Sequence, residues 1–392
     1  MYIGYDEEQE ALRQELRAYY AKLLSPEIRE ELHRGQGIGP TMRSVVRQMG
    51  KDGWLGIGWP VEYGGQGRSD IEQFIFFDES MRAGAPVPML TTNTVGPTIM
   101  RMGTDEQKRE FLPRILAGEI HFCIGYSESQ AGTDLAALST RAERDGDEYV
   151  VNGSKLWTSL AGDADYCWLA VRTDPEVPKH QGISILITDM KSPGIRIDPL
   201  DLMSSHNINA VFLDDVRVPA RNIVAGEGKG WKLITSQLNH ERVTICSSGI
   251  LERAFEDVRS WARATKRPDG RRVADQEWVQ MNLARVYSGL EFLRLLNWKV
   301  AWSSTQGKLD PADASSVKVF GTEWYVESFR LLMEILGPRA YLKRGSPEAV
   351  LTGQLEVLYR SLLILTFGGG TNEIQRDLIG LFGLGFPRVP RH

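Results

Sequence analysis

The spacing of apolar residues changes twice along the chain, and each change marks a different kind of structure. From residue 6 to about residue 118, apolar residues recur at the three- and four-residue steps of a helix face. Helical stretches are expected at residues 12–20, 42–49, 71–81 and 105–117. Glycine and proline separate these stretches, and residues 56–67 are too rich in glycine for a helix interior. The first part of the chain is therefore predicted to be helical.

Between residues 120 and 224 the spacing becomes an alternation of apolar and polar positions, which is typical of strands. Strands are expected at residues 149–151, 155–158, 166–171, 183–187, 195–197 and 210–218. Asn152 and Gly153 form a dipeptide that favours a tight turn because both residues tolerate positive φ, so a hairpin is expected there. An all-β domain is thus predicted to interrupt a helical protein.

After residue 230 the helical spacing returns, and long helices are expected at residues 231–265, 275–306, 313–336 and 350–366. Short connections between long helices favour a bundle. The glycine run at residues 226–230 is interpreted as a strand-to-helix turn, with a phosphate-binding loop as the alternative. The predicted fold class is α+β. Its domains are an N-terminal helical domain (1–119), a middle antiparallel β-barrel or β-sandwich (120–226) and a C-terminal four-helix bundle (227–392).

One carboxylate interrupts an apolar helix face in the first bundle helix. The apolar positions of that face are Ile234, Leu238, Ile245 and Cys246. Glu241 falls on the same stripe, so it is predicted to face the interior. Burial disfavours an ionised carboxylate, and a pKa raised toward neutrality suits a general base. The alternative is a structural ion pair. The candidate partners for such a pair are His240, Arg242 and Arg285.

The composition of the 392-residue chain excludes several classes of partner. Hydrophobic residues make up 42%, charged residues 25%, and the net charge is -5, so no basic field favours nucleic acid or an anionic membrane. The sequence has no run of about 18 apolar residues, and its acidic N-terminal segment does not resemble a signal peptide. Cys123, Cys167 and Cys246 lie far apart without a zinc-binding spacing. We therefore expect a cytoplasmic protein with no metal site.

Two motifs in the β region are similar to those of a known flavoprotein family. Residues 127–134 read Ser-Glu-Ser-Gln-Ala-Gly-Thr-Asp, and residues 152–159 read Asn-Gly-Ser-Lys-Leu-Trp-Thr-Ser. They resemble the T-E-P-x-A-G-S-D and N-G-x-K-x-[WY]-[IT]-[ST] segments of the acyl-CoA dehydrogenases. The resemblance covers nearly the whole chain, including the glycine-rich residues 59–67, and the α-β-α order agrees with it.

The resemblance implies FAD as the cofactor. Ser127 and Ser159, with backbone groups near Tyr126 and Thr158, would hydrogen-bond the flavin ring, and Trp157 would pack on it. Such hydroxyls and amides tune the acceptance of a hydride by the ring. Taken without the resemblance, serine and threonine in these loops favour turns, and Trp157 would be a core residue.

The resemblance also implies contacts with parts of the cofactor and substrate other than the flavin ring. Thr133 would touch the flavin pyrophosphate or the thioester tail, and Thr371 would contact the cofactor. Asn239 and Arg242 would lie near the base and the CoA tail.

The usual catalytic base of the family is missing from this sequence. Most members resemble one another in placing a glutamate just before a Gly-Thr pair late in the chain, and here Gly369 occupies that position. A minority carries the base in an L-x-x-E-R pattern on the first bundle helix, which residues 238–242 match. Glu241 is therefore predicted to remove the α-proton of an acyl-CoA thioester while the β-hydrogen leaves as hydride to the flavin.

Gly369 is predicted to take part in catalysis through its backbone N–H, which could donate a hydrogen bond to the thioester oxygen as negative charge develops there. The three successive glycines at residues 368–370 would leave room for a branched or bulky acyl group. The alternative is a flexible helix end, which glycine commonly provides.

Two segments that reach a neighbour's flavin in homotetrameric relatives are altered here. The R-x-x-F-G motif corresponds to residues 266–270, where Asp269 stands in place of Phe. The Q-x-x-G-G-x-G motif corresponds to residues 334–340, where Glu334 and Pro338 replace Gln and Gly. Added negative charge is unfavourable near a pyrophosphate. The chain is therefore expected to join a homologous subunit in an α2β2 assembly, similar to acyl-CoA dehydrogenases of actinobacterial steroid side-chain degradation.

The implied substrate is a steroid side-chain CoA ester, and the implied electron acceptor is an electron-transfer flavoprotein. One alternative is a homotetrameric dehydrogenase of short branched-chain acyl-CoA. Another is a non-catalytic scaffold subunit in which Glu241 forms an ion pair. An acyl-CoA oxidase fits less well, because such oxidases usually carry a longer C-terminal extension.

Overall fold

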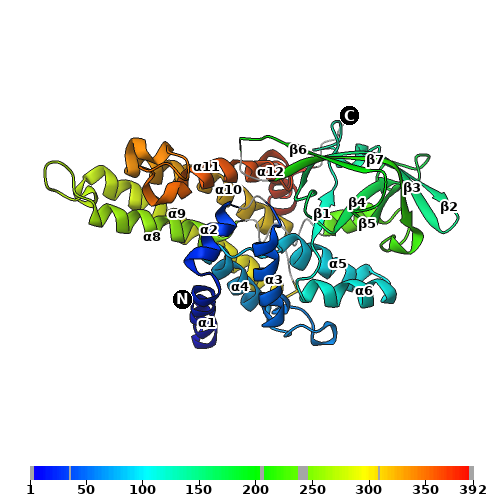
Figure 1. Ribbon diagram of the computed structural model, residues 1–392, viewed down its shortest axis with the longest axis horizontal. Helices are drawn as coiled ribbons and strands as arrows, with labels where there is room; N and C mark the ends of the chain where they lie inside the picture. The colour runs from blue at the N-terminus through cyan, green and yellow to red at the C-terminus, as the bar shows by residue number, and fades with distance from the viewer. Residues whose placement is uncertain (1–3, 35–36, 204–206, 237–245, 308–309, 388–392) are drawn as a thin grey trace.

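The computed structural model has a helical part, a β part and a second helical part in chain order (Figure 1). It describes residues 4–34, 37–203, 207–236, 246–307 and 310–387. The β part lies at one end of the molecule, the long helices of the C-terminal part reach the other end, and the N-terminal helices lie between them. This arrangement confirms the predicted α+β fold class.

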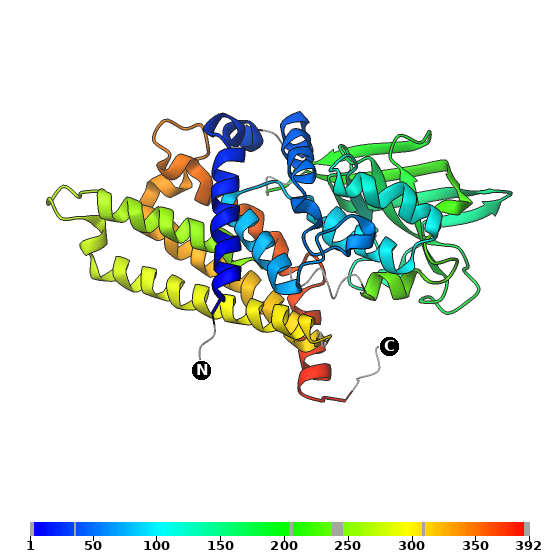
Figure 2. The ribbon, with the colours of Figure 1, turned by 90° about the horizontal axis from the view of Figure 1, so that it is seen from below.

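The N-terminal helices are α1 Glu7–Leu23, α2 Pro26–Arg34, α3 Pro40–Lys51, α4 Asp70–Ala83, α5 Gly96–Met102 and α6 Asp105–Leu116. Three of the N-terminal helices, α1, α4 and α6, begin at a side-chain cap. The Ser69 hydroxyl accepts the N–H of Glu72 at the start of α4, and the Glu72 carboxylate accepts the N–H of Ser69. Thr104 and Gln107 form the same pair of bonds at the start of α6. Figure 2 shows α1 lying across the long helices of the C-terminal part.

A single seven-stranded sheet forms the middle part. Its strands are β1 Phe122–Gly125, β2 Arg141–Asp145, β3 Glu148–Ser159, β4 Tyr166–Arg172, β5 Ile183–Asp189, β6 Ile195–Leu200 and β7 Ile208–Pro219. The order is β1-β4-β2-β3-β7-β6, with β5 paired to β4, and β4 runs parallel to β1 and β2 whereas the other pairs are antiparallel. Apolar residues of α5 and α6 pack against β4 and β5 in one buried cluster, so these helices cover one face of the sheet.

The prediction of a hairpin turn at Asn152-Gly153 is wrong. Both residues lie inside β3, where the pairing with β7 shifts register between Val151 and Gly153. The tight turn lies instead at Gly146 and Asp147, since Asp145 pairs with Glu148 and Gly146 has φ +61°. An Asn-Gly pair tolerates positive φ in a bulge as well as in a turn, so the dipeptide alone cannot distinguish the two.

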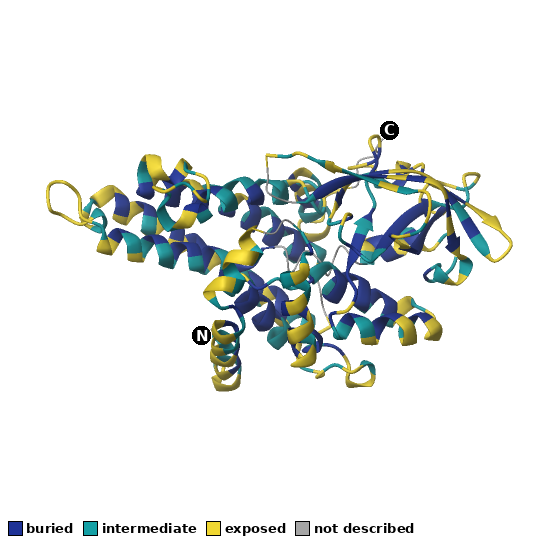
Figure 3. Ribbon diagram, viewed as in Figure 1, coloured by how far each residue is buried: buried dark blue, intermediate teal, exposed yellow. Residues whose placement is uncertain are grey.

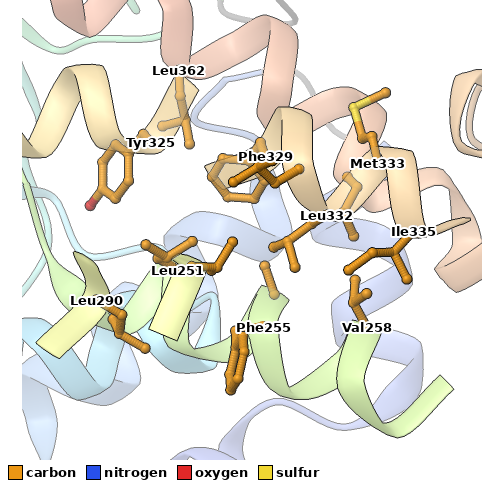
Figure 4. Packing of buried hydrophobic residues seen from close by; sticks show 14 of the residues in the cluster. Leu251, Phe255, Val258, Leu290, Tyr325, Phe329, Leu332, Met333, Ile335 and Leu362 are labelled. Atoms are coloured by element: carbon orange, nitrogen blue, oxygen red, sulfur yellow. The ribbon is translucent and has the colours of Figure 1, made fainter. Parts of the chain in front are cut away.

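The C-terminal part packs around one apolar core. Its helices in the described residues are α8 Ser248–Ala264, α9 Glu277–Thr305, α10 Pro311–Leu336, α11 Gln354–Leu362 and α12 Asn372–Leu378, and residues 230–236 are also helical. Leu251, Phe255 and Val258 of α8 meet Phe329 and Leu332 of α10 in that core (Figure 4). Figure 3 shows buried residues along the inner faces of these helices and exposed ones at the far tip.

The fourth bundle helix is shorter than the prediction of residues 350–366. Leu351, Thr352 and Gly353 have φ of +49°, +57° and +70°, values that no right-handed helix accepts, so α11 begins only at Gln354. A short 3-10 turn, Leu363–Thr366, follows it. The glycine run at residues 226–230 is a turn before the helical residues 230–236, as predicted.

Candidate functional site

The two motif segments of the β part lie side by side. The N–H of Leu156 on β3 donates to the carbonyl oxygen of Ser127 at 2.8 Å. The Nζ of Lys155 donates to the carbonyl oxygen of Tyr126 at 3.2 Å. The two segments that hold the residues predicted to meet the flavin are thereby joined by backbone contacts between residues 29 positions apart in sequence.

A buried ion pair fixes this junction. Lys155 Nζ lies 2.7 Å from Glu128 Oε1, and the two side chains are 1% and 2% exposed. Glu128 also accepts the backbone N–H groups of Ser139 and Thr140 at 2.7 and 2.9 Å. Burial by itself would raise the pKa of Glu128, but the Lys155 ammonium and these hydrogen bonds lower it to about 2. The carboxylate is therefore charged at all physiological pH values and locks the loop after β1 to β3.

Trp157 stands in a strained and exposed position. Its φ is +64°, in the left-handed region that bulky residues rarely adopt, and 55% of its surface is exposed. The pairing of β3 with β7 shifts between Lys155 and Thr158, so Trp157 lies in a bulge. Trp157 is thus not the core residue of the alternative interpretation. An exposed ring held by strained backbone is typical of a ligand-binding position.

The hydroxyl groups near Trp157 point in different directions. The Thr158 side chain is 1% exposed, and it borders the sheet interior beside Gly125 and Lys155. Only the backbone of Thr158 is therefore available to a ligand outside the sheet. Ser159 is exposed, Ser127 is half-buried, and Thr133 is exposed in the turn beyond the Glu128–Ala131 bridge.

The triple-glycine loop, residues 367–371, precedes α12, which Figure 1 places beside the β part. Gly369 and Gly370 have φ of +69° and +96°, so both positions require glycine's conformational freedom. Thr371 caps α12, because its hydroxyl accepts the N–H of Ile374 at 3.3 Å. Among the described residues, the N–H of Gly369 has no hydrogen-bond acceptor. No hydrogen bond between described residues joins Thr371 to Tyr126 or Ser127.

The candidate base and its two neighbours, Glu241, Asn239 and Arg242, lie outside the described residues. The chain is described again from Cys246, where buried groups hold the start of α8. Asp78 of α4 accepts hydrogen bonds from Ser247 Oγ at 2.7 Å and from the Gly249 N–H at 3.0 Å. Of the partners proposed for a structural ion pair, Arg285 is exposed on α9, so it does not provide a buried cation.

Three buried polar residues near the glycine loop were not predicted from the sequence. Lys318 and Thr322 of α10 are fully buried, and Asn372 of α12 is 3% exposed. Lys318 lies between Val317 and Phe320 on a helix that is mostly apolar there. The signal was a charged residue on an apolar helix face, the same signal that singled out Glu241.

Three protein-family domain models match the chain. The N-terminal, middle and C-terminal domain models named for acyl-CoA dehydrogenases match residues 6–119, 123–216 and 228–382. This chain belongs to the acyl-CoA dehydrogenase family. The enzyme class predicted from the motifs is therefore confirmed. Within residues 4–34, 37–203, 207–236, 246–307 and 310–387 of this dehydrogenase chain, no helix is long and apolar enough to cross a membrane.

Two kinds of relative are similar over the full length of this dehydrogenase chain. Acyl-CoA dehydrogenase FadE26 of Mycobacterium tuberculosis is 56% identical, with all of both chains covered. A chain of the ChsE4-ChsE5 complex of M. tuberculosis is 56% identical with a TM-score of 0.93, covering 99% of this chain and 100% of that one. A chain of the Tcur3481-Tcur3483 steroid acyl-CoA dehydrogenase is 48% identical with a TM-score of 0.94, covering 99% and 100%.

Proposed function

We propose that this chain is the base-bearing subunit of a two-protein, FAD-dependent acyl-CoA dehydrogenase that oxidises a steroid side-chain CoA ester. The observation that carries the proposal is the junction of the two motif segments, which brings Ser127 of the loop after β1 beside the bulged strand β3, with its exposed Trp157 ring and Ser159. The full-length similarity to chains of a steroid acyl-CoA dehydrogenase and of the ChsE4-ChsE5 complex supports the substrate class and the two-protein assembly.

The described residues fit a flavin. Trp157, in the bulge of β3, offers a flat aromatic side chain that is more than half exposed. The hydroxyls of Ser127 and Ser159 and the backbone of Tyr126 and Thr158 would hold the polar edge of the ring. FAD, when bound, supplies the acceptor for the β-hydrogen of the substrate. An aromatic wall beside it would also exclude water from the reacting carbons.

Residues of the chain itself would remove the α-proton and bind the substrate and cofactor. Glu241 would take the α-proton, with Asn239 and Arg242 near the base and the CoA tail. Gly369, placed where most relatives carry a carboxylate, would offer its N–H to the thioester oxygen. Thr133 would approach the pyrophosphate or the thioester tail, and Thr371 would approach the cofactor.

The surface of α9 supports assembly with another chain. Apolar residues at three- and four-residue steps are about half exposed along this helix. They are Trp278, Met281, Phe292, Leu295 and Trp302. A groove of about 530 Å³ beside them is lined by Phe292, Phe320 and Trp324 among others. A long stripe with this spacing is the surface that one helix offers to another.

The two altered motif segments support a heteromer in a different way. Asp269 lies in the segment between α8 and α9, where its carboxylate pairs with Arg271 at 3.2 Å. Glu334 pairs with Arg330 and accepts a hydrogen bond from Asn282 at 3.1 Å. The acids Asp269 and Glu334 thus stand where homotetrameric relatives have Phe and Gln, and added negative charge there is unfavourable near a neighbour's flavin pyrophosphate.

The test compares the chain alone with the chain co-expressed with a homologous acyl-CoA dehydrogenase gene encoded beside it. Flavin content, molecular mass and ferricenium-linked oxidation of a steroid side-chain CoA ester are measured for both. We expect FAD and activity only in the co-expressed assembly. Full flavin and activity in the lone chain would support the homotetramer instead, and oxidation of short branched acyl-CoA alone would remove the steroid assignment. Unchanged activity after Glu241→Gln would support the scaffold alternative.

A further inference from the structure

A single buried ammonium joins both ends of the triple-glycine loop. Lys318 Nζ donates to the carbonyl oxygens of Thr366 at 3.2 Å and Gly370 at 2.7 Å, and to Asn372 Oδ1 at 2.8 Å. An ammonium donates through three N–H groups, and among the described residues these three oxygens lie within hydrogen-bond distance of it. The loop therefore closes around Lys318, which is fully buried.

Two N–H groups of the loop have no acceptor among the described residues. Phe367 and Gly368 donate to the carbonyl of Ile364 at 3.1 and 2.7 Å. In contrast, the N–H groups of Gly369 and Gly370 donate to no other described residue. Left-handed φ at both glycines directs the carbonyl of Gly370 to Lys318, and the same backbone turn sets where the free N–H groups lie. The direction of these donors thus depends on the bond from Lys318.

A second layer of polar groups holds the far side of the loop. Asn372 Nδ2 donates to Thr322 Oγ1 at 3.0 Å and to Glu323 Oε1 at 3.2 Å. Glu323 in turn pairs with Arg376 of α12 at 2.7 Å. Because Thr322 and Glu323 follow Lys318 on α10 by about one turn, one helix fixes the whole loop.

The same face of α10 also contacts the start of α8. A Cβ on Gly321 would come within 2.5 Å of Cys246 Cβ, so α10 and the chain at Cys246 are in close approach. The hydroxyl of Tyr325 donates to the carbonyl of Ser247. Helix α10 therefore connects the glycine loop with the described residue that comes directly after the stretch containing Glu241.

Packing alone does not explain a lysine at this position. Removing an ammonium from water costs several kcal/mol, and an apolar side chain of similar length would fill the space without that cost. A charged donor strengthens and directs its hydrogen bonds more than a neutral one does. The lysine is therefore better suited to fixing backbone geometry than to filling volume.

We propose that Lys318 is a positioning residue that fixes the triple-glycine loop so that the Gly369 N–H stays in place to bind the thioester oxygen of the substrate. The proposal rests on the proposed function, because it assumes that the loop lies beside the reacting thioester. Lys318 touches the loop and not the substrate, and it acts through the Gly370 and Thr366 carbonyls.

The test uses the co-expressed assembly with Lys318→Met. The ligand is the 3-thia analogue of a steroid side-chain CoA ester, which can lose its α-proton but cannot be oxidised, and its bound enolate gives a long-wavelength absorption band with oxidised flavin. Losing a preorganised donor to the developing oxyanion typically costs about 10² to 10³ in rate. We expect partial loss here: the pH midpoint of enolate formation rises by about 1 to 2 units, and kcat for the parent ester falls about 10- to 100-fold with KM changed less than about threefold.

Lys299→Met is the matched control, because it makes the same substitution at an exposed lysine of α9 whose ammonium pairs with Asp313 at 2.7 Å and, among the described residues, not with the loop. We expect it to move the midpoint by less than about 0.3 unit. If Lys318→Met does not fold, Asn372→Ala removes one of the three acceptors and should raise the midpoint by about 0.5 unit. If the folded Lys318→Met variant, or Asn372→Ala in its place, forms the enolate with the same pH midpoint as wild type, the role of Lys318 is overturned. A wild-type assembly that neither forms the enolate nor oxidises the ester overturns the proposed function instead.

Discussion

At the scale of single residues, the proposed chemistry depends on Glu241. Glu241→Gln keeps the size of the side chain and removes its ability to take a proton. We expect flavin reduction by substrate to slow at least about 10²-fold, the usual contribution of a general base. Rapid-mixing measurement of flavin bleaching provides the rate, and binding of substrate should persist.

The matched control for Glu241 is Glu252→Gln on α8. Glu252 is a buried carboxylate that contacts Arg82 at 3.4 Å and Arg17 at 3.6 Å, and it has no predicted catalytic role. We expect this variant to lose stability but to bleach its flavin at nearly the wild-type rate. A Glu241→Gln enzyme that bleaches as fast as the control would exclude Glu241 as the base.

Trp157 provides a second residue-scale prediction, in which stability and binding move in opposite directions. Its left-handed backbone costs about 1 to 2 kcal/mol in a non-glycine residue, and its half-exposed ring gains little from burial. Trp157→Gly should therefore leave the flavin-free protein as stable as wild type or up to about 1 kcal/mol more stable. The same change should weaken FAD binding at least tenfold, because the aromatic face is lost.

Chemical denaturation of the flavin-free protein and fluorescence titration with FAD measure the two effects of Trp157→Gly. Trp157→Phe retains an aromatic face and should keep most of the affinity. A glycine variant that is clearly less stable and binds FAD normally would show that the ring serves the fold and not the cofactor.

The sequence predicted these residues as a set but not their orientation. Motif order placed residues 126–127 and 157–159 in one site, and the backbone contacts join them. The inward hydroxyl of Thr158 and the exposed ring of Trp157 follow from a bulge that depends on the register of β3 with β7. That register involves residues about 50 positions away, such as Asn209 opposite Thr158, so local periodicity could not reveal it.

At the scale of elements, the Glu128–Lys155 pair joins the loop after β1 to β3. The folded-state pKa of Glu128, about 2, lies below its ordinary value of 4.5. The pair's contribution is therefore complete above about pH 4.5 and is lost as the pH falls through about 2. Glu128→Gln should reduce the free energy of unfolding by about 3 to 5 kcal/mol at pH 7, since it leaves a buried ammonium unpaired.

Urea unfolding between pH 2 and pH 7 tests this element-scale prediction. In wild type the free energy of unfolding should fall steeply below about pH 4.5, and in Glu128→Gln this part of the fall should be missing. Glu143→Gln is the control, because Glu143 and Arg141 form an exposed pair on β2 whose loss should cost less than about 1 kcal/mol. Equal losses from Glu128→Gln and Glu143→Gln would contradict the locking role.

Element boundaries were predictable where local spacing decides them. The helices α3, α4 and α6 begin and end within a few residues of their predicted ranges, because caps and apolar periodicity are local signals. The shortened α11 departs from its prediction because Leu351 and Thr352 adopt positive φ although neither is glycine. Tertiary packing enforces such a conformation, and the sequence around it carries no sign of it.

At the scale of the whole molecule, the order of helical, β and helical parts was predictable and the sheet topology was not. The change of apolar spacing from helical to alternating and back is visible along the chain itself. By contrast, β1 pairs in parallel with β4, so Phe122 lies opposite Tyr166. Because parallel partners need a long connection, their pairing is a property of the assembled sheet.

The exposed stripe of α9 leads to a prediction about assembly. Phe292 and Leu295 are 49% and 46% exposed in the single chain, so replacing both with glutamate should lower the free energy of unfolding of the lone chain by only about 1 to 2 kcal/mol, partly through the lost Phe292–Phe320 contact. If the stripe packs against a partner chain, two buried carboxylates without partners would be strongly unfavourable there. We therefore expect the double variant to fold but to associate at least about tenfold more weakly.

Sedimentation velocity on the co-expressed proteins measures the association. The control is Val61→Glu, at an exposed position on an N-terminal turn, which should assemble normally. Normal assembly of the double variant would place the partner on another face, and then the exposed tip and the altered segments around Asp269 and Glu334 would be the next surfaces to change.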